Sequence, residues 1–181
     1  MQVVRTTKEI VGFEPAVGVE WDAGYLPHAP AHRRVRVSVR KDADSRWTVY
    51  AKAYRGAITL AEHDLAVLDC EACAKALALS VVFPNSRYSC VHHNRKAVSE
   101  SAIFHGLLSC LVALMGIDAS TWATLDEGSR HRCQWVVRLI MNGEIDLLRA
   151  IRAWEAAEEF AKELSLSLNE QVSWWYNEIS K

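Results

Sequence analysis

Residues 101–117 read SAIFHGLLSCLVALMGI, and this stretch decides how the rest of the chain can fold. Between its ends only His105 and Ser109 carry strongly polar side chains, so a helix here has no face suited to water. A helix that crosses a bilayer needs about 20 apolar residues, more than this run offers. We therefore predict a buried central helix over residues 99–116, with His105 as a hydrogen-bonded core side chain.

The clearest strand pattern lies upstream, in residues 33–54. Valines alternate with arginines as far as a turn at residues 42–44, and apolar residues alternate with polar ones after it. A period of two predicts an antiparallel β-hairpin with one apolar face. Placing both apolar sets on that face pairs Val39 with Trp47.

Helical patterns follow the hairpin. Capping boxes predict helix starts at Thr59, Thr124 and Ser167. The predicted fold class is α+β, in which a small N-terminal antiparallel sheet packs on a C-terminal bundle of about five helices around the central one. A chain of 181 residues is typical of a single domain. Its β-rich part would span residues 1–58 and its helical part residues 59–181.

Composition narrows the class of protein. The net charge of −1 argues against a surface that binds polyanions over its whole extent, although residues 1–60 hold ten Lys or Arg against six Asp or Glu. Five cysteines, an odd number, favour reduced thiols over a disulfide framework. The first residues lack the apolar core of a secretory signal. We expect a cytoplasmic protein with no membrane contact.

The polar face of the hairpin is the leading candidate site. There cations alternate with aromatic residues, and no carboxylate occurs between Arg33 and Lys41. Arginine and tyrosine are typical anchors of protein interfaces, and the combination also suits single-stranded nucleic acid. The alternative is an ordinary solvated sheet face. The predicted partner-binding residues are Arg34, Arg36, Arg40, Tyr50, Lys52 and Tyr54.

A second candidate site is the polar loop that precedes the central helix. Because helix N-termini attract anions, it is a candidate anion-binding site made of His92, His93, Arg95 and Lys96. A thiolate activated by a histidine could make the same loop, residues 90–96, a catalytic site. The simplest alternative is a solvated loop.

Four side chains have the spacing of a zinc site: Cys70, Cys73, Cys90 and His93. However, the segment CEACAK has no glycine for a tight metal-binding turn, and its cysteines fall on an apolar helical stripe with Leu77 and Val81. Such cysteines behave as small buried apolar residues. We predict no metal and no cofactor, with these four residues as the ligands if zinc is bound.

No phosphate-binding loop, metalloprotease motif or nucleophile elbow occurs in the chain. The sequence thus favours a non-enzymatic interaction protein, such as an adaptor, an immunity protein or a phage-type inhibitor of a host nucleoprotein or defence complex. A nucleic-acid-binding module, stabilised by zinc or not, is the first alternative. A small enzyme that uses the loop at residues 90–96 is the second.

Overall fold

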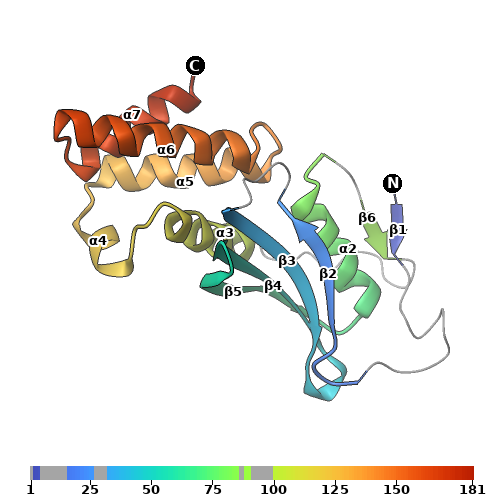
Figure 1. Cartoon of the computed structure of the whole chain (residues 1–181). Coiled ribbons are helices and arrows are strands. Elements are labelled where there is room, and N and C mark those ends of the chain that lie inside the picture. The colour runs from blue at the N-terminus through green and yellow to red at the C-terminus, as the bar shows by residue number, and fades with distance from the viewer. Residues whose placement is uncertain (1, 5–15, 27–31, 86–87, 91–99) are drawn as a thin grey trace.

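The computed structural model describes residues 2–4, 16–26, 32–85, 88–90 and 100–181, arranged as Figure 1 shows. Four antiparallel strands form the main sheet in the order β2-β3-β4-β5. Their bounds are Glu20–Tyr25, Arg33–Lys41, Trp47–Arg55 and Ile58–Leu68. Beside this sheet, β1 (Gln2–Val4) pairs in parallel with β6 (Tyr88–Cys90).

The hairpin predicted over residues 33–54 is formed by β3 and β4, with a register two residues away from the predicted one. Val39 pairs with Val49 rather than with Trp47. A 3₁₀ turn at Ala43–Ser45 occupies the tip and moves the centre of the hairpin along the chain. Because the shift is an even number of residues, each side chain keeps its predicted face.

Residues 58–68 form the strand β5, so the helix predicted to begin at Thr59 is wrong. Gly56, with a φ of +58°, lies in the two-residue connection between β4 and β5. A positive φ in so short a connection folds the chain back as a hairpin. Pairing along β4 then overrides the local capping preference. The β-rich part of the chain consequently reaches Leu68 instead of ending at residue 58.

Six helices follow within the described residues, which confirms the α+β class with a helical C-terminal region. Their bounds are Glu71–Val82 (α2), Glu100–Leu114 (α3), Ala119–Thr124 (α4), Glu127–Met141 (α5), Leu147–Leu164 (α6) and Leu168–Ile179 (α7). None of the helices in the described ranges is long and apolar enough to cross a membrane.

Two predicted helix starts can be compared with the observed caps. The Ser167 hydroxyl accepts a hydrogen bond from the N–H of Glu170, whose carboxylate accepts one from the N–H of Ser167, which confirms that capping box. The box predicted at Thr124 is wrong. Asp126 caps α5 instead, accepting from the N–H of Ser129 at 2.7 Å, and aspartate is the better N-cap of the two residue types.

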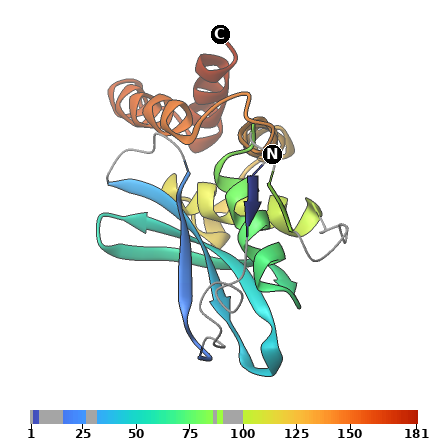
Figure 2. The ribbon, with the colours of Figure 1, turned by 90° about the vertical axis from the view of Figure 1, so that its right-hand side faces the viewer.

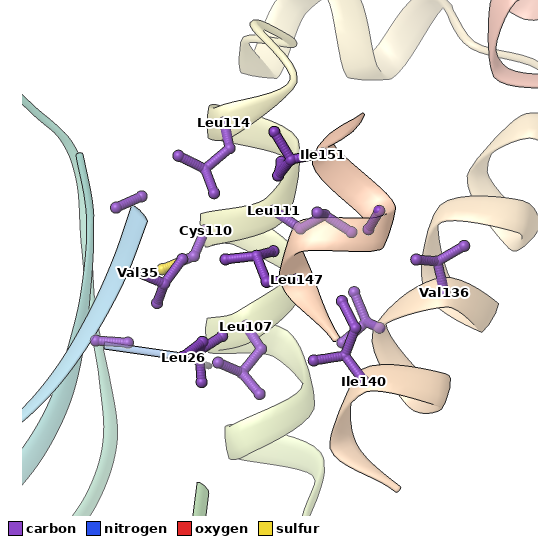
Figure 3. Packing of buried hydrophobic residues seen from close by; sticks show 14 of the residues in the cluster. Leu26, Val35, Leu107, Cys110, Leu111, Leu114, Val136, Ile140, Leu147 and Ile151 are labelled. Carbon is purple, nitrogen blue, oxygen red and sulfur yellow. The ribbon is translucent and has the colours of Figure 1, made fainter. Parts of the chain in front are cut away.

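Helix α3 is the centre of the core but is not enclosed on every side. Helices α2 and α3 cover one face of the sheet, and α5 and α6 pack on the side of α3 away from it (Figures 1 and 2). Figure 3 shows Leu107 and Leu111 of α3 in one buried cluster with Val35 of β3 and Leu147 of α6. In contrast, His105 is exposed, so its prediction as a core histidine is wrong.

Two buried tryptophans tie the C-terminal helices together. The indole N–H of Trp154 donates to the carbonyl of Met115 at 3.0 Å, and that of Trp175 donates to the carbonyl of Ala150 at 2.9 Å. Their rings meet edge to face with centroids 5.6 Å apart. Both polar N–H groups are therefore satisfied inside an apolar environment, as buried indoles require.

Candidate functional site

The strongest candidate is the face of the sheet opposite α2 and α3, which no described helix covers (Figure 2). Residues that pair across antiparallel strands share a face, so the pairing defines its members. This outer sheet face consists of Glu20, Asp22 and Tyr25 of β2, Arg34, Arg36, Ser38 and Arg40 of β3, Thr48, Tyr50, Lys52 and Tyr54 of β4, and Thr59, Glu62, Asp64 and Val67 of β5. It brings together all six residues predicted from the hairpin.

The cations of the outer sheet face lie over tyrosine rings. The distances from cation to ring centroid are 4.3 Å for Arg34 over Tyr25, 5.5 Å for Arg36 over Tyr54, 5.0 Å for Arg40 over Tyr50, and 5.5 Å for Lys52 over Tyr50. Each such contact contributes about 0.5–1 kcal/mol at an exposed site. The long cationic side chains are thereby held in place before any partner arrives.

Carboxylates from the two outer strands, which the hairpin sequence alone did not reveal, balance these cations. Asp22 accepts hydrogen bonds from Ser38 Oγ at 2.6 Å and from Arg36 Nη1 at 3.4 Å. Glu62 lies 3.4 Å from Arg40 Nη1 and 3.8 Å from Lys52 Nζ. With Glu20 and Asp64, the face has four carboxylates beside four cations. It is a face of mixed charge rather than a uniformly basic one.

Tyr50 is the support of this arrangement and has no exposed surface of its own. Its hydroxyl donates to Glu20 Oε1 at 2.5 Å. Burial, followed by the bond to Glu20, raises the pKa of Tyr50, so the hydroxyl stays a proton donor. Tyr50 therefore positions Arg40 and Lys52 above it and offers no contact surface to a partner.

The electrostatics keep the arginines charged. Partial burial acts to lower the pKa of Arg36, but Asp22 and the nearby tyrosines raise it above its ordinary value. Burial likewise acts to lower the pKa of Arg40, whereas the hydrogen bond with Asp42 raises it. The pKa of Arg40 is again raised overall. Both guanidinium groups remain available for charge-assisted hydrogen bonds.

One end of the sheet is fastened to α6 by ion pairs. Arg33 donates to both carboxylate oxygens of Glu158, at 2.8 and 3.4 Å, and only 8% of the Arg33 side chain is exposed. Next to it, His32 Nε2 lies 2.7 Å from Glu155 Oε1. Part of the acidic side of α6 thus has a structural role, connecting elements far apart in the sequence.

The other candidate sites lie partly or wholly outside the described residues. The anion-binding candidates His92, His93, Arg95 and Lys96 all do. Cys70 is the N-cap of α2 rather than part of a helical stripe, and its Sγ accepts from the N–H of Cys73 at 3.4 Å. Within the described part of the chain, no group of three or more His, Cys, Asp or Glu side chains is placed to hold a metal. The absence of zinc stays a prediction, because the fourth ligand of the set is His93.

A cleft of about 410 Å³ opens between the ends of α2 and α5 and the start of α6. Two of its charged groups already have structural partners. Asp146 caps α6 through the N–H of Arg149, and the Arg149 guanidinium donates to the carbonyl of Ile179 at 2.7 Å. The side chain of Asn85 lies against Gly143, where an added Cβ would force it to move. These groups do not form a nucleophile with its base.

No protein-family model, curated protein or solved structure matches this chain. Inferences about its function rest on the geometry of the sites above.

Proposed function

We propose that this chain is a non-enzymatic interaction protein of the cytoplasm that binds a protein partner through the outer sheet face. The observation that carries the proposal is the arrangement of arginines over tyrosines, held by carboxylates, on a face that no described helix covers. Ordered side chains lose little conformational entropy when a partner binds. An adaptor, an immunity protein or an inhibitor of a host defence complex would each use such a face.

The balance of charges favours a protein over a nucleic acid as the partner. A polyanion that approached the arginines would also meet Glu20, Asp22, Glu62 and Asp64. Nucleic-acid affinity depends on neutralising several phosphates with unopposed cations, and here most cations already face a carboxylate. A protein surface of alternating charge can match both signs.

Arg34 and Tyr25 form the part of the face best suited to anchor a partner. The guanidinium of Arg34 stacks on Tyr25 but forms no ion pair with any described residue, and Tyr25 is 39% exposed. Truncating an arginine or tyrosine anchor at an interface costs about 2 kcal/mol or more. That value corresponds to a loss of affinity of about thirtyfold.

The proposal is tested by photo-crosslinking in the cells that make the protein. A photoreactive amino acid replaces Arg34 in one variant and Arg152, an exposed residue of α6, in the control. We expect a discrete protein adduct from position 34 that position 152 does not give, and we expect Tyr25→Ala to reduce its yield. Adducts with nucleic acid, or equal yields at both positions, would contradict the proposal.

Binding in solution separates the two classes of partner further. Proteins that bind nucleic acid non-specifically typically do so with a Kd of about 10⁻⁴–10⁻⁶ M at physiological salt. At about 150 mM salt, the purified protein should show no such binding to a single-stranded oligonucleotide. Fluorescence anisotropy measures this directly. Micromolar binding that weakens steeply with salt and is lost in the Arg36→Glu variant would favour the nucleic-acid alternative.

A further inference from the structure

Strand β5 forms one edge of the main sheet, and its outer side pairs with no described strand (Figure 1). With 11 residues it is also the longest of the four strands. An unpaired edge presents a row of main-chain N–H and C=O groups that can accept another strand. Its length offers more such groups than the six-residue strand β2 at the opposite edge.

The middle of β5 has the regular geometry that such pairing needs. The pairing with β4 shifts at two places, which leaves Leu60 and Leu65 as extra residues. Between them, residues 61–64 pair one by one with β4. Bulges interrupt a ladder, so an added strand would be centred on this regular stretch.

The side chains around this stretch specify the chemistry of a partner strand. Glu62 and Asp64 project on the outer sheet face, and both are exposed. Among the described residues Asp64 forms no direct ion pair, although its charge helps to raise the pKa of Arg40. Apolar side chains flank the carboxylates, with exposed fractions of 65% for Ile58, 39% for Leu60 and 50% for Val67. A complementary strand has Lys or Arg at two alternating positions and apolar residues on either side of them.

Helix α3 leaves room for that strand on the other face of the sheet. It packs mainly over β5, less over β4 and hardly over β3, so it lies above the edge rather than above the middle. Gly106 faces Leu65 and His63 of β5. By spacing, this side of the helix also carries Ala102, Ser109 and Ala113, which are small, next to the buried Ile103 and Cys110. An added strand would extend the layer beneath α3 on the side where Ala102, Ser109 and Ala113 lie.

The same carboxylates disfavour a second copy of this chain. A symmetric antiparallel pair of β5 strands keeps each side chain on its own face, so residues 62 and 64 of one copy come opposite or next to those of the other. Like charges directly opposite each other destabilise a sheet. Charge complementarity therefore selects a basic partner strand over self-association.

We propose that β5 accepts an extended segment of a partner protein as a fifth strand, with its basic residues facing Glu62 and Asp64. This inference rests on the proposed function for the partner being a protein. It adds main-chain pairing at the edge of the sheet, which a short peptide can test separately from the proposed anchor at Arg34 and Tyr25.

The probe is a capped heptapeptide with lysine at its third and fifth positions and valine, threonine or leucine elsewhere. We expect it to bind and to slow amide hydrogen exchange at residues 61–64, followed by NMR. One control peptide has N-methyl groups on alternate amides and cannot complete the ladder. The other has glutamate in place of lysine. Neither should bind.

Variants of the protein provide the matched test. Asp64→Lys should weaken binding of the lysine peptide at least tenfold, about 1.4 kcal/mol, and should restore binding of the glutamate peptide. Asp64 is exposed and forms no ion pair with the described residues, so Asp64→Asn should melt near the wild-type temperature. Asp64→Lys places a cation near Arg40, on which the carboxylate of Asp64 normally acts, and should melt slightly below it. Arg34→Ala, on the outer sheet face, should leave peptide binding unchanged.

Several outcomes would overturn the inference. One is binding of the N-methylated peptide that equals binding of the lysine peptide, and a second is amide protection at β2 instead of β5. A third is failure of the lysine peptide to bind at about 1 mM, a concentration that corresponds to a free energy of binding of only about −4 kcal/mol. The last is a dimer of the protein alone that Asp64→Lys disrupts. If the peptide binds as expected while crosslinking at position 34 fails, only the proposed outer-face function is refuted. The reverse pair of results refutes only the edge-strand inference.

Discussion

Gly106 gives the most direct test of how α3 approaches the sheet. A Cβ at this position would lie 2.3 Å from Leu65 Cδ2, far inside van der Waals contact. Leu65 is only 1% exposed, so its side chain cannot swing into solvent. Replacing glycine by alanine inside a helix is normally stabilising by about 1 kcal/mol, whereas overpacking a core costs about 1–3 kcal/mol. We expect Gly106→Ala to lower the free energy of unfolding by about 1 kcal/mol.

A double-mutant cycle, measured by urea unfolding, isolates the contact. In a Leu65→Ala background the clash is removed, so Gly106→Ala should instead raise the free energy of unfolding by about 1 kcal/mol. Gly128→Ala in α5 is the control, because its Cβ would meet the flexible end of Arg132 at 3.2 Å and would be in ordinary contact with Asp126 Oδ1 at 3.6 Å. That variant should be stabilised by about 0.5–1 kcal/mol in either background.

The sign of the Gly106 effect decides the matter. If Gly106→Ala alone stabilises the protein as much as Gly128→Ala does, and does so equally with and without Leu65, then α3 does not lie against β5 as described. An added strand at β5 would then have no layer of α3 to fit beneath.

Three further predictions concern the core and its connections. Arg33→Ala breaks the pair with Glu158. Because that carboxylate is one-third exposed, we expect the free energy of unfolding to fall by about 2 kcal/mol, less than the roughly 3–5 kcal/mol of a fully buried pair. A change under about 0.5 kcal/mol in urea unfolding, typical of a surface site, would contradict this. Burial raises the pKa of the Cys110 and Cys133 thiols to about 12, so at about pH 8 iodoacetamide should label them only after unfolding, and mass spectrometry that finds them labelled in the native protein would refute this. Trp154→Phe keeps an aromatic ring but leaves the carbonyl of Met115 without its indole donor. This should lower the free energy of unfolding by about 1–3 kcal/mol, measured by thermal unfolding. An unchanged melting temperature would show that water replaces the bond.

The parts of the fold that the sequence predicts well are those with a strong local period. The valine–arginine alternation specified β3 and both of its faces, and the capping box at Ser167 specified the start of α7. The register of the hairpin was missed because the turn, not the alternation, sets it, and a shift of two residues leaves the pattern of faces unchanged.

Strand β5 shows why the rest of the candidate site was hidden. The segment ITLAEHDLAVL contains a plausible helix cap at Thr59, yet Glu62 and Asp64 alternate with Ala61 and Leu65 as in a strand. Only the pairing with β4, a contact with the preceding strand, decides between the two readings. Two of the four carboxylates on the outer sheet face, Glu62 and Asp64, came from this misassigned segment, and the other two came from β2. The hairpin sequence therefore presented a basic face where the folded protein has a mixed one.

The pair between Arg33 and Glu158 joins residues 125 positions apart. At a translation rate of about 5–20 residues per second, the partner of Arg33 is made about 6–25 s later. Throughout that interval a newly made sheet can form its local hairpins but cannot be fastened to α6. The edge of β5, which pairs with no described strand in the folded protein, is also unpaired in the ribosome-bound chain during that interval. The two carboxylates on that strand would then act as gatekeepers during synthesis, repelling the same edge of a neighbouring nascent chain on one polysome.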